Sequence, residues 1–99
     1  MSRYTQTTQK NRISYAWGFD HAIGYFFSKY DEKIDGEEDD NCVFSISSVL
    51  TLIHRDKSKR KPRYSNGEIL QAMEEEETLD SELKIPEEHK EAIAMDIPF

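Results

Sequence analysis

Asp20 and His21 place a carboxylate beside an imidazole, the side chains that general acid–base catalysis most often uses. Neighbouring residues of an extended chain point to opposite faces, however, so adjacency in sequence does not bring the two groups together. No nucleophile or cofactor-binding motif accompanies them in the sequence. We therefore predict a turn residue at Asp20 and an exposed loop residue at His21, and we expect that the protein is not an enzyme.

The sequence also lacks the spacings typical of metal and disulfide sites. Cys42 is the single cysteine, so it has no partner within the chain and is expected to be a buried structural thiol. His21, His54 and His89 stand too far apart for a metal-ligand motif. We therefore expect no bound metal and no cofactor.

Charged residues are segregated along the chain. Residues 31–40 carry a net charge of −6, residues 54–63 of +5 and residues 74–91 of −7, within a total of −7. The acidic blocks are similar in composition to small acidic inhibitors encoded by phages and mobile elements, in which carboxylates occupy a partner's phosphate-binding groove. Solubility alone would also account for them.

The basic block at 54–63 is the candidate contact surface for an anionic partner. Its three central cations are Lys59, Arg60 and Lys61. They could meet a phosphate backbone or an acidic protein surface, or they could pair with the protein's own acidic segments. The sequence leaves these readings open.

Composition limits the partners and the compartment. A net charge of −7 argues against a general nucleic-acid binder and against binding to an anionic membrane, because both need a cationic surface. No stretch approaches the roughly 20 apolar residues of a membrane span, and no signal-peptide pattern is present. We expect a cytoplasmic protein.

Seven of the eleven aromatic residues lie between Tyr15 and Tyr30. Alternating large apolar residues from Ile13 onward indicate a strand, and a second aromatic run follows Gly24, so residues 12–30 are predicted to form a hairpin with a wide loop. A short helix over 21–30 is the alternative, against which Gly24 and the aromatics weigh.

Four residues of this hairpin are candidates for partner binding. They are Trp17, Asp20, His21 and Tyr25. Exposed Trp and Tyr side chains give large contact area at low entropic cost, which is typical of protein-binding surfaces.

The remaining elements are assigned from local signals. The polar segment 1–11 is predicted to be a flexible arm, and 42–48 a strand, while 47–54 fits either strand or helix and is assigned to strand. A capping box at Ser65 and Glu68 predicts a helix over 66–77, and Pro86 followed by acids predicts a second over 86–95.

We predict a single α+β domain over 12–99: an antiparallel sheet of about three strands, with the two C-terminal helices covering one face. The expected function is non-enzymatic: a small acidic interaction module or inhibitor that binds a protein partner. One alternative is a nucleic-acid-binding accessory protein that uses residues 54–63. Another is a structural protein that forms a homodimer.

Overall fold

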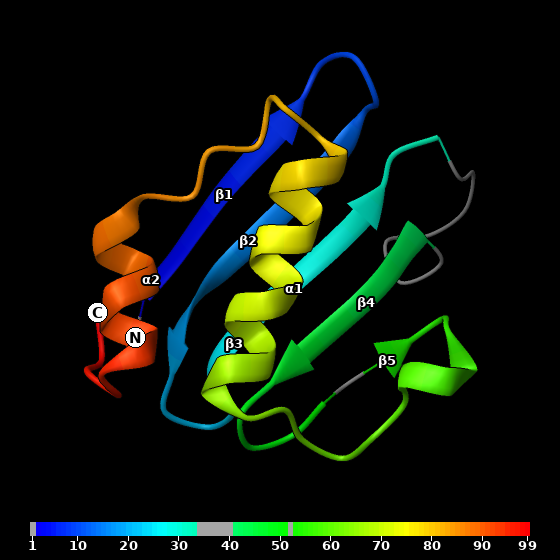
Figure 1. The fold of residues 1–99 in the computed structure, drawn as a ribbon. Coiled ribbons are helices and arrows are strands. Elements are labelled where there is room, and N and C mark those ends of the chain that lie inside the picture. Colours follow the sequence, from blue (N-terminus) through cyan, green and yellow to red (C-terminus); the bar gives the residue numbers. More distant parts are fainter. Residues whose placement is uncertain (1, 34–40, 52) are drawn as a thin grey trace.

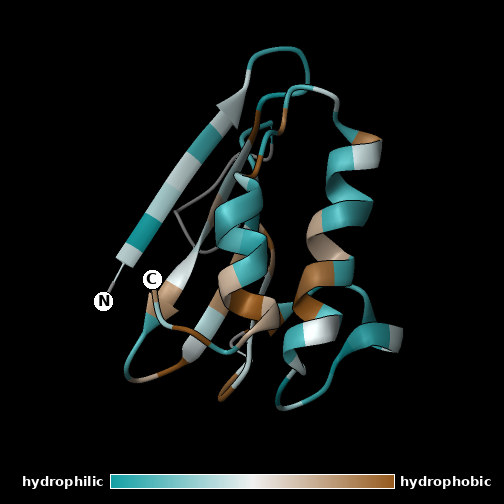
Figure 2. Ribbon diagram, turned by 60° about the vertical axis from the view of Figure 1, so that its left-hand side comes forward, coloured by the Kyte–Doolittle hydropathy of each residue, from teal (hydrophilic) through white to brown (hydrophobic). Residues whose placement is uncertain are grey.

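The computed structural model describes residues 2–33, 41–51 and 53–99, in which the strands come first along the chain and the helices last (Figure 1). The elements in chain order are β1 (Ser2–Thr8), β2 (Ile13–Asp20), β3 (Gly24–Asp31), β4 (Cys42–Ser47), β5 (Ile53–His54), the short 3₁₀ turn η2 (Lys57–Lys59), α1 (Asn66–Leu79) and α2 (Glu87–Ala94). Both helices lie on the same face of the sheet (Figures 1 and 2). The predicted α+β class with two C-terminal helices is confirmed.

The sheet has five antiparallel strands in the order β1-β2-β3-β4-β5, so the prediction of about three strands is wrong. The first additional strand, β1, lies within the segment 1–11 that was predicted to be a flexible arm. β1 pairs with β2 through the backbone along its whole length, from Ser2 opposite Phe19 to Thr8 opposite Ile13. A strand held in this way needs no hydrophobic period, and the sequence of β1 shows none. The other additional strand, β5, contains only two residues of the ambiguous segment 47–54.

The aromatic hairpin is confirmed as β2 and β3, but its loop is tight rather than wide. Only three residues separate the paired Asp20 and Gly24. Gly24 adopts φ of +77°, which favours glycine, and Asp20 Oδ1 accepts a hydrogen bond from the backbone N–H of Ala22 at 2.7 Å. The alternative helix over 21–30 is wrong, since β3 occupies most of that range.

The two helices begin close to where the sequence signals placed them. Ser65 Oγ accepts from the N–H of Glu68, and the Glu68 carboxylate accepts from the N–H of Ser65, so the predicted capping box is present. Pro86 stands immediately before α2. The helices are linked by an ion pair between Lys90 and Glu77; although burial opposes it, this hydrogen-bonded carboxylate raises the pKa of Lys90.

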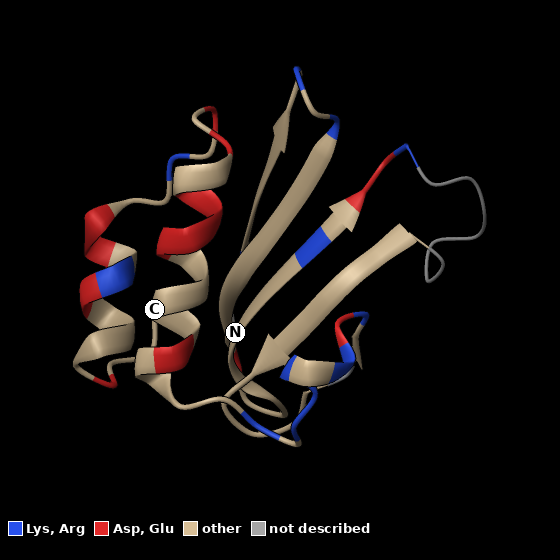
Figure 3. Ribbon diagram, turned by 45° about the vertical axis from the view of Figure 1, so that its right-hand side comes forward, with Lys and Arg blue, Asp and Glu red and all other residues tan. Residues whose placement is uncertain are grey.

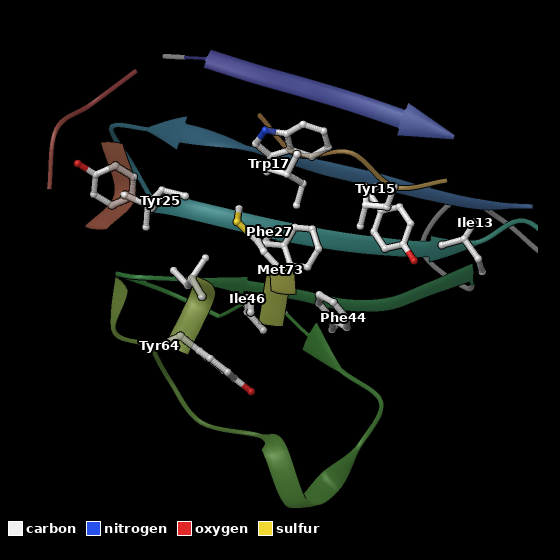
Figure 4. Close-up of a cluster of buried hydrophobic side chains, with 13 residues drawn as sticks. Ile13, Tyr15, Trp17, Tyr25, Phe27, Phe44, Ile46, Tyr64 and Met73 are labelled. Carbon is white, nitrogen blue, oxygen red and sulfur yellow. The ribbon is translucent and has the colours of Figure 1, made fainter. Parts of the chain in front are cut away.

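The core lies between the helices and the inner face of the sheet (Figure 4). Its buried members are Ile13, Tyr15, Trp17, Tyr25, Phe27, Phe44, Ile46, Tyr64, Ile69, Met73, Leu83, Ile85 and Ile93. The register sets Trp17 opposite Phe27 and Phe19 opposite Tyr25, so these four aromatic rings share one face of the sheet. Figure 2 shows that both helices are largely hydrophilic, which leaves much of the core volume to these rings.

Trp17 is tied to α2 and to both ends of the described chain. Its Nε1–H donates to His89 Nδ1 at 3.0 Å. The His89 ring lies 4.3 Å from the Tyr4 ring and 4.9 Å from the Phe99 ring, measured between centroids. These contacts bring β1, α2 and the C-terminal segment together around the hydrogen-bonded pair of Trp17 and His89.

Gly18 lies directly against the backbone of β1, which leaves no space for a side chain. A Cβ at this position would lie 2.3 Å from the backbone carbonyl oxygen of Ser2, a contact that no side-chain movement can relieve. Gly18→Ala should therefore displace the start of β1 and lower the free energy of unfolding by about 1–3 kcal/mol, measured by urea denaturation. Gly67→Ala is the matched control, because its nearest atom would be 4.0 Å away, and it should be neutral or stabilising. Equal stability of the two variants would contradict this account.

Asp80 joins the end of α1 to the connector that follows. The residue is buried, and its Oδ1 accepts from the N–H of Glu82 at 3.2 Å. Burial works to raise the pKa of Asp80, but this bond and the nearby Thr8 and Asn11 side chains outweigh it and hold the pKa below its ordinary value. Oδ2 itself makes no hydrogen bond of ordinary geometry within the described part of the chain.

This lowered pKa gives a stability contribution that depends on pH. The contribution is fully present above the pKa of Asp80 in the unfolded state, about 4, and is lost as the pH falls through the lower pKa of the folded state. Asp80→Asn should flatten the acid limb of a stability-against-pH curve measured by denaturation, whereas Glu88→Gln, at an exposed position on α2, should leave it unchanged. An acid limb that is identical in wild type and Asp80→Asn would count against the assignment.

Candidate functional site

A cleft of about 480 Å³ opens between α1 and the segment that follows β4, and we call it the α1 cleft. Its floor is formed by residues of β3 and β4, one wall is α1, and the other is the basic loop (residues 54–63). Its lining residues are Lys29, Val43, Phe44, Ile46, His54, Asp56, Ser58, Lys59, Arg60, Lys61, Tyr64, Glu68, Gln71, Ala72, Glu75 and Glu76. Figure 3 shows cations gathered on the loop and carboxylates on the helices, so the two walls differ in charge.

The floor of the α1 cleft is apolar and aromatic. Phe44 packs on Phe27 at 5.5 Å between ring centroids, and the His54 ring stacks on Phe44 at 5.4 Å. Tyr64 lines the cleft where the floor meets the basic loop, and its hydroxyl donates to the carbonyl of Lys59 at 2.5 Å. The floor can therefore accept an apolar side chain between the charged walls.

A charged cluster forms the inner end of the cleft. Lys29 Nζ lies 2.6 Å from Glu76 Oε1, with the two side chains 20% and 12% exposed. Tyr15 donates its hydroxyl hydrogen to the same oxygen at 3.3 Å. Burial first, and then the negative charges of Glu76 and Asp80, raise the pKa of Tyr15, so the phenol remains a donor.

The basic loop is held by its own backbone contacts. Asp56 Oδ1 caps the turn η2 by accepting from both the N–H and the hydroxyl of Ser58, at 3.0 and 2.7 Å, and these bonds lower the pKa of Asp56. Arg60 donates from Nε to the carbonyl of His54 at 2.7 Å. The loop therefore presents its cations from a fixed backbone.

His54 is held in its neutral form. Its Nδ1 accepts from the backbone N–H of Asp56 at 3.0 Å, which leaves no room for a proton on that nitrogen. Burial lowers the pKa of His54, and Lys59 and Arg60 add to this, against the opposing charge of Asp56.

Three of the loop cations have no acidic partner within the described part of the chain. Lys61 pairs with Glu68 across the mouth of the cleft and lies 4.5 Å above the Tyr64 ring. Within the described residues, Lys57, Lys59 and Arg60 make no ion pair. Among the described residues, pairing between the basic block and an acidic segment is therefore seen for Lys61 alone of these four. Residues 34–40 of the acidic block lie outside the described residues, so their predicted pairing stays a prediction.

The structure brings Lys59, Arg60 and Lys61 together at the α1 cleft and places the other predicted site residues elsewhere. Trp17 and Tyr25 are each 3% exposed, so they lie in the core rather than on an aromatic surface patch. They are buried because the pleat places them on the face that the helices cover.

Asp20 and His21 have local roles at the hairpin turn. Asp20 accepts from the turn backbone, and the exposed His21 ring meets the edge of Phe19 at 5.4 Å. The turn does not belong to the α1 cleft.

Tyr25 keeps an incompletely satisfied hydroxyl. Burial, followed by the Asp96 carboxylate, raises the pKa of Tyr25 to about 12. The Asp96 carboxylate is close enough to disfavour loss of the Tyr25 hydroxyl proton, but the hydroxyl has no partner of ordinary hydrogen-bond geometry within the described chain.

Sequence reasoning missed Lys29 and Glu76, although both leave a periodic signal. Lys29 stands two residues after Phe27 and so falls on the inner face of β3. Glu76 follows Met73 by three positions and Ile69 by seven, so it falls on the inner face of α1. A lysine and a glutamate at inward positions of separate elements predict an ion pair, because each charge needs a partner of opposite sign where water is excluded.

Comparison with known proteins gives no assignment: no family model, no curated protein and no solved structure matches this chain. Within the described residues, no set of three or more His, Cys, Asp or Glu side chains is arranged to hold a metal ion. In the same part of the chain, neither helix has the length and apolar character needed to cross a membrane.

The Lys29–Glu76 pair should show strong energetic coupling. Lys29→Met leaves the Glu76 carboxylate without its cation and should lower the free energy of unfolding by about 2 kcal/mol or more. Adding Glu76→Gln, which retains an acceptor for Tyr15, should restore part of that loss. A double-mutant cycle by chemical denaturation measures the coupling, with Lys84→Met at an exposed position as control. Strictly additive effects would rule the coupling out.

Proposed function

We propose that the protein is a non-enzymatic interaction module that binds an acidic segment of a partner protein in the α1 cleft. The observation that carries the proposal is the presence of Lys59 and Arg60, without ion-pair partners among the described residues, beside an aromatic cleft of about 480 Å³. Cations of this kind attract carboxylates, and the aromatic floor adds apolar contact area.

The charge of the opposite wall favours a protein segment over a nucleic acid. Glu68 and Glu75 lie on α1 across the cleft from the basic loop. A continuous phosphate backbone in the cleft would pass close to these carboxylates and be repelled, whereas a peptide can alternate its charges along its length. The fitting segment places acids toward Lys59 and Arg60 and an apolar side chain against the stacked rings of His54 and Phe44.

The partner can be tested by site-specific photocrosslinking in the native host. A photoreactive phenylalanine derivative in place of Gln71, an exposed residue that lines the cleft, should capture a discrete partner. Adding Lys59→Glu and Arg60→Glu should reduce capture by about tenfold or more, because each reversal turns an attraction into a repulsion. The captured protein is then identified by mass spectrometry and its affinity measured by calorimetry.

Two controls separate specific from general effects. The same derivative at Thr78, exposed on α1 outside the cleft lining, should capture little, and Lys84→Glu should leave capture at Gln71 unchanged. Equal capture at both positions, or capture insensitive to the charge reversals, refutes the proposal. A nucleic-acid mobility shift at low salt that is lost in the double charge reversal would instead support the accessory-protein alternative.

A further inference from the structure

β1 is an edge strand with one side unpaired. It follows β2 along seven residues and has no neighbour on its other side within the described sheet, whereas the strand at the opposite edge, β5, has only two residues. Arg3, Tyr4, Thr5 and Thr7 are exposed. An edge of this length offers a row of free backbone donors and acceptors.

The pairing with β2 reveals which backbone groups point outward. The N–H of Phe19 donates to Ser2 Oγ at 3.2 Å, and the N–H of Ile13 is directed at Thr8 Oγ1 at 3.4 Å, so these residues of β2 face β1. No register shift interrupts the ladder between them. Because backbone direction alternates, the even-numbered residues of β1 face β2, and the N–H and C=O groups of Arg3, Thr5 and Thr7 face away from it.

This edge lacks the usual protection against pairing. Its seven residues contain no proline and no bulge, and Arg3 is the only charged side chain among them. The connector between α1 and α2 contacts β1 through the N–H of Lys84, which donates to the Gln6 side chain at 2.7 Å. That contact is made to a side chain and uses none of the outward backbone groups of β1.

We propose that β1 pairs with β1 of a second copy of this chain, antiparallel and centred on Thr5, to form one continuous sheet. In this register Thr5 lies opposite its own copy, and Arg3 lies opposite the partner's Thr7. All three outward-facing residues then meet outward-facing residues, which allows about six backbone hydrogen bonds. No like charges are opposed, since each Arg3 faces a threonine.

The side chains of β1 suit pairing with a second copy, because the two-fold register opposes residues that are compatible with each other. Tyr4 is set opposite the partner's Gln6 on the helix side, where the close spacing of a non-hydrogen-bonded pair brings the ring against the amide. The contact buries little apolar surface, so we expect a dissociation constant of about 1–100 μM.

Thr5→Pro tests this pairing at the edge itself. Proline removes only an outward N–H at this position, so the β1–β2 ladder keeps all its donors. Sedimentation equilibrium over a concentration series should show a reversible dimer for the wild type and at least about tenfold weaker association for the variant. Thr5→Val, which retains the N–H, should associate like the wild type, and circular dichroism checks that each variant is folded.

Amide hydrogen exchange provides a second test that needs no substitution. The N–H groups of Arg3, Thr5 and Thr7 should exchange more slowly as the protein concentration rises, while the exposed amides of the β2–β3 turn should not change. A wild type that stays monomeric at the highest concentration overturns the proposal. A dimer that Thr5→Pro leaves intact, with no added protection at these amides, overturns it as well. The α1 cleft lies toward the other edge of the sheet, so neither outcome depends on the proposed partner.

Discussion

The covering of one aromatic sheet face is the constraint on which the rest of the structure depends. β2 and β3 pair so that Trp17 and Phe27 stand opposite each other on the side that the helices cover. Each such ring buries about 150–250 Å², a large share of the apolar area available to a chain this polar. Because α1 and α2 offer few apolar residues, their positions are set by where they can contact these rings. The orientation of α1 in turn brings Glu76 to Lys29 and creates one wall of the cleft.

The parts of the fold that could be predicted have local causes. The alternation around Tyr15 and Trp17 indicated a strand, and Ser65 with Glu68 indicated a helix start, since in both cases the signal lies within a few residues. β1 could not be found in this way, because its polar residues are held by backbone bonds to a strand that follows four residues later. β5 falls within the segment 47–54 that was assigned to strand, but its position there could not be predicted, since two residues carry no period.

Of the candidate site, only the exposed cations of the basic loop could be predicted from the sequence. A run of cations such as Lys59 to Lys61 is solvated in almost any fold, so its surface location follows from composition. Which of those cations stays unpaired depends on the distance between the loop and α1, which only the tertiary structure gives. Whether Trp17 and Tyr25 are exposed depends on which face of the sheet the helices cover. The alternation of residues along the strands is the same for either face, so the sequence could not show that these two residues are buried.

The strand order has a further consequence for how the chain folds. Every strand pairs with its immediate neighbour in sequence, so the β1–β2 and β2–β3 hairpins close small loops and can form early, including during synthesis on the ribosome. The helices that cover the aromatic face are the last elements of the described chain. Until α1 and α2 arrive, a growing sheet exposes Tyr15, Trp17 and Phe27 to solvent together. The most vulnerable moment for this protein is therefore the interval in which its sheet is complete and its helices are not, when nascent chains would associate through the very rings that later form the core.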